Sequence, residues 1–477
     1  METPSRPFIG RNYFYGVANG ALFHLGAYGL INGNIVIPPF VYQLAERGGV
    51  GEGWAQVMVG LVSGVSVVGW LWPQIIFSNI IEPFERKKPF YVVSGLLRQA
   101  AFAAIPLGIL LLAAPHPLVL YWVVATAFFL YTSFGGIGLL PFMDIISRSM
   151  PDDMRGRFFG ARAFWGCSLA FAGGFLVEYI LDPTTGPAFP RNYLALFLMA
   201  WAATGLAVVL FCLAKEPPGR GRTARITLPQ QVLRAPRLLR RDRDFLRIFI
   251  TRMILGLVSI AGPFYVLYAK DRFGVQDSAT GLFVSSEVVF AALAALMWGR
   301  VGDRFGNRAL MLLGTILCFL VPTAALSIKA LPLAGYAFLG KPLHVWAFCG
   351  LFALVGFAQS GTTIAAVNYL LDIAPDQRRP TYLGVMYTAT APLTFMPVLG
   401  GALVGWWSYE GVFCVAAFLA LLLIVSAARL REPRAAAAHA AASFIGIPFL
   451  RPVRWIAGKL TLQKQKPPSE QDPRPPR

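Results

Sequence analysis

The sequence has few charged side chains: Asp, Glu, Lys and Arg make up only 14% of its 477 residues, against about 25% in an ordinary soluble domain. Hydrophobic residues make up 56% and are spread along the whole chain. A water-soluble fold of this size could not bury them all. The composition therefore excludes a soluble globular protein and predicts a polytopic membrane protein surrounded by lipid.

Cysteine and catalytic motifs are also scarce. The five cysteines lie within apolar runs, and their spacing fits neither a disulfide framework nor a metal site. The sequence has no HExxH, GxSxG, P-loop or EF-hand motif. We therefore expect no enzymatic activity, no metal and no cofactor.

Acidic side chains are fewer than basic ones: the sequence has 23 Asp and Glu and 42 Lys and Arg, so its formal net charge is +19. The basic residues lie in short segments between apolar runs and not in one patch, so no nucleic-acid partner is expected. This distribution is typical of a membrane protein whose basic loops stay in the cytoplasm.

Twelve apolar runs reach the roughly 20 residues that a membrane-spanning helix requires. They cover residues 13–41, 54–78, 90–113, 118–146, 158–181, 192–214, 248–269, 278–299, 309–329, 343–371, 381–406 and 410–430. The first run is too long for a signal peptide and is kept as a span. The predicted fold is all-α, with twelve transmembrane helices.

The basic residues also predict the orientation of these helices. With a cytoplasmic N-terminus, 36 of the 42 Lys and Arg fall inside, and six fall outside: Arg47, Arg191, Lys270, Arg272, Lys329 and Lys341. We therefore expect both termini in the cytoplasm. The expected location is the plasma membrane, specifically a bacterial inner membrane, with a monomer surrounded by lipids.

Two segments are too polar to span the membrane. Residues 215–247 begin Pro/Gly-rich and then become basic and amphipathic, a pattern that predicts a surface helix against anionic lipid headgroups. Residues 435–477 form a basic tail whose end has little to bury, so the end is expected to be disordered. These segments follow two predicted six-helix bundles, residues 1–214 and 248–434.

The two halves repeat each other at an offset of 224 residues. The matching positions after spans 4 and 10 are Asp144 and Asn368, Pro151 and Pro375, Arg155 and Arg379, and Gly160 and Gly384; earlier in each half, Asn79 matches Asp303. A Glu-Pro pair ends each half, at residues 216–217 and 432–433. This duplication predicts two pseudo-symmetric six-helix bundles.

The segment 299–308, GRVGDRFGNR, resembles the cytoplasmic signature of the major facilitator superfamily, which lies between the second and third helix of a half. The twelve spans, the repeat and the P-x-x-x-R-G pattern before span 5 agree, so the resemblance covers about residues 12–432. It implies a secondary transporter with a gating motif at the cytoplasmic mouth. The gating positions are Gly299, Asp303, Arg304, Gly306 and Arg308, with Asn79, Arg86, Lys87, Asp144, Arg155 and Arg379.

Parts of the superfamily pattern are missing. The first-half loop, residues 78–88, keeps the basic cluster but lacks the leading glycine and the aspartate. Span 5 lacks the G-P-x-x-G-G of drug/proton antiporters, and the sugar-porter arginine motifs after spans 6 and 12 are absent. The resemblance therefore gives no support for drug antiport or sugar transport.

Two gating carboxylates have expected partners. Asp144, at the cytoplasmic end of span 4, is expected to pair with the basic cluster of residues 86–88. Asp303 is expected to lie near the N-terminus of the helix entered at Arg155, where the helix dipole favours an anion. There it would act as a latch in one conformation.

Charges inside the spans are the candidates for function, because an ionised side chain at the bilayer centre costs about 2.5–3.5 kcal/mol. Glu287 lies near the middle of span 8 with no basic residue within a turn. It is either a protonatable coupling group or substrate contact, or a carboxylate that a neighbouring helix satisfies. Arg98, about ten residues into span 3, is either structural or a substrate anchor.

Span 1 carries a polar stripe. His24, Tyr28 and Asn32 are spaced at i, i+4 and i+8, which places them on one face of a continuous helix. The stripe either lines a cavity or relays protons, or it makes hydrogen bonds between helices. Gln359 and Asn368 in span 10 are further polar candidates.

Together these features predict a secondary transporter that works by alternating access on a small amphipathic or neutral organic solute. Proton coupling is expected because Glu287 and His24 can titrate. The alternatives are a lipid-like substrate, or a non-transporting protein of the same fold that acts as an assembly factor or receptor.

Overall fold

The computed structural model describes residues 6–81, 83–217, 238–333, 335–375 and 379–432. These residues are almost entirely helical. The helices of the N-terminal half are α1 (Arg6–His24), a π-helix η1 (Leu25–Leu30), α2 (Ile37–Arg47), α3 (Glu52–Val68), α4 (Trp72–Ile81), α5 (Lys88–Leu112), α6 (Pro117–Ser149), α7 (Asp152–Leu181) and α8 (Arg191–Cys212).

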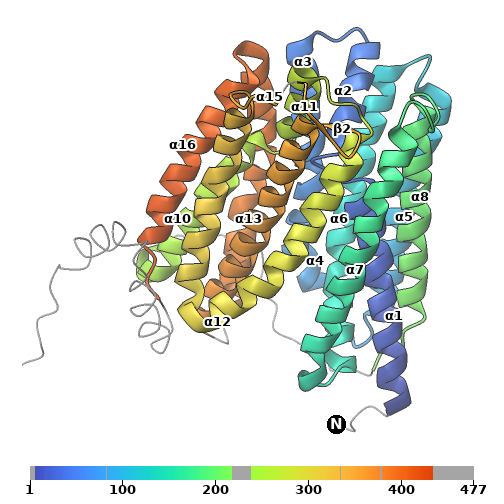
Figure 1. Ribbon diagram of the computed structural model, residues 1–477. Coiled ribbons are helices and arrows are strands. Elements are labelled where there is room, and N and C mark those ends of the chain that lie inside the picture. The colour runs from blue at the N-terminus through green and yellow to red at the C-terminus, as the bar shows by residue number, and fades with distance from the viewer. Residues whose placement is uncertain (1–5, 82, 218–237, 334, 376–378, 433–477) are drawn as a thin grey trace, which may run out of the picture.

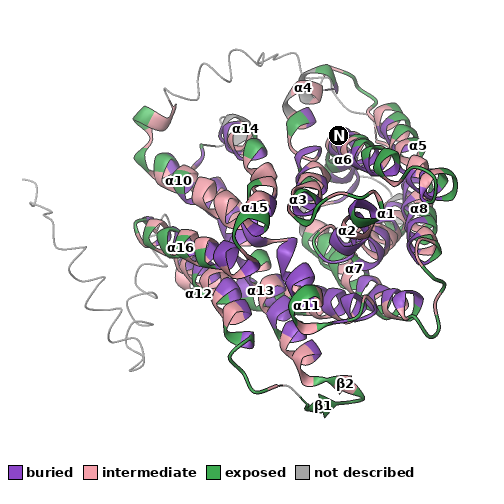
Figure 2. Ribbon diagram, turned by 90° about the horizontal axis from the view of Figure 1, so that it is seen from above, coloured by how far each residue is buried: buried purple, intermediate pink, exposed green. Residues whose placement is uncertain are grey.

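The C-terminal half is built in the same way. Its elements are α10 (Arg243–Val258), η2 (Ser259–Ala261), α11 (Phe264–Phe273), α12 (Ala279–Ile328), α13 (Leu343–Ile373), α14 (Arg379–Thr390), η4 (Ala391–Phe395), α15 (Met396–Trp406) and α16 (Tyr409–Ala428). A two-stranded antiparallel hairpin, β1 (Ala337–Phe338) and β2 (Lys341–Pro342), precedes α13. Seen from above, α1–α8 and α10–α16 form two bundles side by side, as predicted (Figure 2).

The observed helices begin and end at other residues than the twelve predicted spans do. Among the described residues, ten helical segments are long and apolar enough to cross a membrane. One of them, α12, contains the predicted spans 8 and 9, which meet at a kink at Gly306. The first predicted span is not among the ten, because it is divided into α1, η1 and α2. The protein is a multi-pass all-α membrane protein.

The prediction of one continuous helix over residues 13–41 was wrong, and the reason lies in its glycines and prolines. A Cβ on Gly29 would lie 2.9 Å from the Cα atom of Ala170, so this stretch packs backbone to backbone against α7. Helical structure stops after Leu30 and resumes at Ile37, where Pro38 takes the first-turn position that tolerates a missing N–H.

The two halves are joined tightly at the end of the bundle opposite the N-terminus. There α3 runs along α15 so closely that a Cβ on Gly60 would lie 2.2 Å from the carbonyl oxygen of Pro397, and a Cβ on Gly401 would lie 2.3 Å from that of Gln56. On the other side of the interface, Gly174 of α7 packs in the same way against Gly281 of α12. Towards the N-terminal end, the helices of the two halves diverge (Figure 1).

The repeat is visible in contacts between the helices of each half. The Glu216 carboxylate accepts hydrogen bonds from the backbone N–H groups of Lys87 (2.5 Å) and Lys88 (3.0 Å), at the start of α5. The Glu432 carboxylate accepts one from the N–H of Arg308 at 2.9 Å, just after the kink in α12. Each glutamate therefore satisfies the otherwise unpaired N–H groups at the start of the third helix of its half.

Gly306 makes this arrangement possible in the C-terminal half, and its replacement is our first prediction. Its φ of 86° and ψ of 166° belong to a region that is essentially restricted to glycine, and a Cβ there would lie 2.2 Å from Glu432 Oε2. Gly306→Ala should therefore lower the free energy of unfolding by about 1–3 kcal/mol and reduce the melting temperature of the detergent-solubilised protein.

Gly299→Ala is the matched control, because a Cβ on this glycine of α12 would meet no atom within 4 Å. Its melting temperature should stay at or slightly above that of the unmodified protein, since alanine favours helix more than glycine does. Equal melting temperatures for the two variants would contradict this account of Gly306.

Several sequence-based predictions lie outside the described residues. They concern most of the amphipathic linker (residues 218–237) and the basic tail, of which nothing from residue 433 on is described. The side chains of Asn79 and Arg379 are also outside the described set. The surface helix, the disordered end and the roles of these two side chains therefore stay predictions.

Candidate functional site

A hydrogen bond connects the two halves at Glu287. The Glu287 side chain on α12 is buried, with 8% of its surface exposed, and its Oε2 atom accepts a hydrogen bond from Nδ2 of Asn32 at 2.9 Å. The Oδ1 atom of Asn32 accepts from the backbone N–H of Asn34 at 3.0 Å, which turns the amino group towards Glu287. Two residues selected separately from the sequence therefore meet across the interface between the halves.

The predicted single face of His24, Tyr28 and Asn32 is only partly correct. His24 and Tyr28 remain neighbours, with ring centres 5.2 Å apart, and Nδ1 of His24 lies 2.7 Å from the Gly20 carbonyl oxygen. Asn32, however, lies beyond the π-helix in the break between η1 and α2. The helical spacing does not extend through this break, and this allows Asn32 to reach Glu287.

A cavity with a volume of about 470 Å³ lies between the halves. In the first half, its walls come from α3, the turn after α3 and Asn34. In the second half, they come from α10, η2, α11, α12, α13, α14, η4 and α15. Gln359 lines it, as do Arg252, Tyr265 and several Ser and Thr hydroxyls. Asn368 lies on the same helix as Gln359 but is not among the lining residues.

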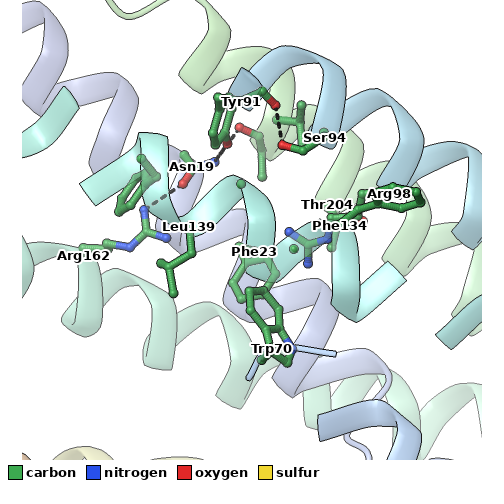
Figure 3. Close-up of a pocket in the computed structure, with 16 residues that line it drawn as sticks. Asn19, Phe23, Trp70, Tyr91, Ser94, Arg98, Phe134, Leu139, Arg162 and Thr204 are labelled. Carbon is green, nitrogen blue, oxygen red and sulfur yellow. Dashed lines mark hydrogen bonds between the residues drawn. The ribbon is translucent and has the colours of Figure 1, made fainter. Parts of the chain in front are cut away.

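Another cavity, with a volume of about 120 Å³, lies within the N-terminal half. Its walls come from α1, α5, α6, α7, α8 and the turn after α3, and they are mostly apolar and aromatic (Figure 3). The polar side chains on its walls include Asn19, Ser94, Arg98, Arg162 and Thr204. Arg98, for which the sequence left a structural role and a substrate-anchor role open, therefore lies at a cavity.

The sequence-based selection missed Arg162 and Arg252. Arg162 is the fifth residue of the predicted span 5, and Arg252 is the fifth of span 7, so both look like basic residues that end a span at the cytoplasmic surface. The structure places both on cavity walls instead. The available signal was that each has apolar residues on both sides, in FFGARAFWG and in FITRMILG.

The segments that carry the predicted gating residues, such as the start of α7 and the kink of α12, lie at the end of the bundle that carries the N-terminus (Figure 1). Asp144 Oδ1 pairs with Lys87 Nζ at 2.9 Å, and its Oδ2 pairs with Arg148. The guanidinium of Arg155 donates to the carbonyl oxygen of Ser147. No ion pair joins Asp303 to the described residues of α7, and Arg86 likewise has none among the described residues.

Polar bonds accompany the glycine packing at the opposite end. Lys341, the first residue of β2 in the hairpin, pairs with Glu178 of α7 at 2.6 Å. Gln43 Nε2 donates to Asp277 at 2.8 Å, and Gln56 Nε2 donates to the Tyr409 hydroxyl at 2.7 Å. Each of these contacts joins the first half to the second, so this end is closed by side chains as well as by backbone contacts.

Residues 248–463 match the family model described as Major Facilitator Superfamily. The C-terminal half of the chain is therefore similar to this superfamily. Among curated relatives, it is 26% identical over 221 residues to a putative sugar efflux transporter of Deinococcus radiodurans, a match that covers 44% of this chain and 54% of the relative. It is 30% identical over 173 residues to a multi-drug resistance efflux pump PmrA homolog of Lactococcus lactis, covering 35% and 39%. The matches therefore span about half or less of these relatives.

Solved structures of membrane transporters show the same fold. The nucleoside transporter NupG superposes with a TM-score of 0.59 at 14% identity, covering 89% of this chain and 98% of that one. A bacterial homologue of the iron transporter ferroportin, in its inward-facing state, superposes with a TM-score of 0.63 at 14% identity, covering 90% and 99%. Identities this low establish the shared fold and no more.

Proposed function

We propose that the chain belongs to the major facilitator superfamily and is a secondary transporter that moves a small amphipathic organic solute by alternating access. The observation that carries the proposal is the cavity of about 470 Å³ between the halves, together with the close packing of α3 on α15 and of α7 on α12 at one end only. A site between two rocking bundles, sealed on one side, is what alternating access requires. This conformation is then the inward-facing one.

We also propose that transport is coupled to protons through Glu287. Glu287 is a buried carboxyl group, and within the described part of the chain it accepts a hydrogen bond from Asn32 of the other half. Protonation or deprotonation of this carboxyl group changes the strength of a contact between the halves. Proton binding can therefore bias the equilibrium between the two conformations, as a coupling group must.

Counterflow in liposomes tests the transport function. Purified protein would be reconstituted in liposomes preloaded with an unlabelled solute, and uptake of the same labelled solute would be followed across panels of neutral and anionic amphipathic compounds. Accelerated exchange of any solute, relative to protein-free liposomes, supports transport. If no solute exchanges while a protein partner co-purifies, the chain is instead a non-transporting receptor or assembly factor of this fold.

We also propose that both termini are cytoplasmic, in a bacterial inner membrane. The basic residues Lys87, Lys88, Arg148 and Arg308 gather at the end of the bundle that carries the N-terminus, as the positive-inside tendency requires. A reporter enzyme active only in the cytoplasm, fused after residue 477, should be active. Activity of a reporter specific for the outer side at that position would overturn this orientation.

A further inference from the structure

Two arginines reach the cavity of the N-terminal half, and the described residues provide no carboxylate for either. Arg98 extends from α5 and Arg162 from α7 (Figure 3). The described ion pairs of this half are formed elsewhere, with Asp144 on Lys87 and Arg148 and with Glu178 on Lys341; these acids do not line the cavity. Within the described protein, the cavity therefore carries two positive charges that no ion pair compensates.

Neutral acceptors hold Arg162 in place. Its Nη1 atom donates to the Gly16 carbonyl oxygen at 2.8 Å and to Asn19 Oδ1 at 2.7 Å. Asn19 donates from its Nδ2 atom to the Tyr91 hydroxyl at 3.2 Å, so its oxygen has to face Arg162 (Figure 3). Among the described residues, the bonds to Arg162 use only Nη1, which leaves the donors on Nε and Nη2 for a ligand.

Aromatic rings hold Arg98. Its guanidinium carbon lies 4.1 Å from the ring centre of Tyr131, 4.8 Å from that of Phe23 and 5.2 Å from that of Trp70. Its Nη2 atom donates to the Tyr131 hydroxyl at 2.6 Å. Its Nε atom is buried and has no hydrogen-bond partner. The rings stabilise the cation and fix its plane without neutralising it.

This arrangement identifies a class of ligand. Buried guanidinium groups are costly unless they are paired, and their fork of donors matches the oxygens of carboxylates and phosphates. The remaining walls are apolar, with Phe23, Trp70 and Phe134 among them. We propose that this cavity binds the oxyanion group, a carboxylate or phosphate, of the amphipathic solute. This inference rests on the proposed transport function and names the chemical class of its substrate.

Binding of matched pairs of compounds tests the inference. The protein would be placed in nanodiscs of phosphatidylcholine alone, and thermal stabilisation would be titrated with benzoate against benzamide and with phenyl phosphate against phenol. Each pair keeps the aromatic body and changes the charge. At least one anion should stabilise the protein with an affinity about tenfold or more above that of its neutral counterpart. Equal responses within both pairs, or no response to either anion, would overturn the proposal.

Variants assign the effect to the two arginines. Arg98→Gln and Arg162→Gln should each weaken binding of the responding anion about tenfold or more, with little change for the neutral compound. Arg162→Lys should retain part of the affinity, because it keeps the charge and loses the fork. Arg191→Gln, at an exposed arginine that starts α8 in the same half, should bind like the unmodified protein. Retention of full anion affinity in both glutamine variants would overturn the proposal.

Two further arms keep the results distinct. A glutamine variant that does not elute as a monodisperse peak would be replaced by the lysine variant at the same position. The salt dependence of anion binding to the unmodified protein would then be measured as well. Anion binding that does not weaken with added salt would contradict the assignment. Phosphatidylglycerol added to the nanodiscs should compete with the soluble anion only if a lipid headgroup also fits the cavity. Counterflow of a neutral solute without anion binding would refute this inference and leave the transport function standing.

Discussion

Glu287→Gln is expected to abolish solute accumulation driven by a pH gradient while leaving solute exchange intact. Glutamine keeps the shape of the side chain and can still accept the hydrogen bond that Asn32 donates at 2.9 Å. It cannot bind or release a proton. If Glu287 carries the coupling proton, the variant is held in one protonation state and the gradient can no longer do work through this site. Uptake into liposomes with an imposed pH gradient, compared with counterflow at equal pH, measures the two activities separately.

Glu46→Gln is the control for Glu287→Gln, because Glu46 is exposed at the end of α2 and forms no ion pair with a described residue. It should accumulate solute normally. If Glu287 is only a structural acid, Glu287→Gln should accumulate solute as well as the control does and be as stable or more so, because a buried charge has been removed. Full accumulation by Glu287→Gln would end its assignment as the coupling group and make His24 the next residue to test.

Features that depend on composition and on periodic repeats could be predicted from the sequence. The membrane class, the two bundles and the duplication follow from apolar runs and from matching positions 224 residues apart. The duplication also pointed to the two Glu-Pro pairs, whose glutamates bind the starts of α5 and of the second part of α12. The contact between Asp144 and Lys87 joins two residues that the superfamily resemblance had placed together.

Features that depend on where two segments meet could not be predicted. Glu287 was selected because a charge in a span is costly, but its partner Asn32 lies 255 residues away in sequence, and no periodicity connects the two. Periodicity was misleading for span 1, because it assumes an unbroken α-helix and the chain breaks after Leu30. For Arg162, a rule that assigns basic residues to the membrane surface hid a side chain that lines a cavity.

Gly60→Ala should prevent the two halves from closing at the end opposite the N-terminus. The added Cβ would lie 2.2 Å from the carbonyl oxygen and 2.5 Å from the carbonyl carbon of Pro397. These are backbone atoms, so α3 and α15 must separate. Overpacking of this kind costs about 1–3 kcal/mol, which shifts a two-state equilibrium about 5- to 150-fold away from the closed arrangement. Gly401→Ala should act in the same way, because its Cβ would lie 2.3 Å from the Gln56 carbonyl oxygen.

Spin labels report this shift directly. In a background in which the five native cysteines are replaced by serine, labels would be attached at two exposed positions of this end, Thr184 in the first half and Leu331 in the second. The distance distribution between them should lengthen in Gly60→Ala. It should stay unchanged in Gly350→Ala, since a Cβ on that glycine of α13 would meet nothing within 4 Å. Because the shifted protein rarely reaches the inward-facing state, its exchange rate should fall with the closed population. An unchanged distance together with normal exchange would mean that α3 and α15 do not need this close contact for transport.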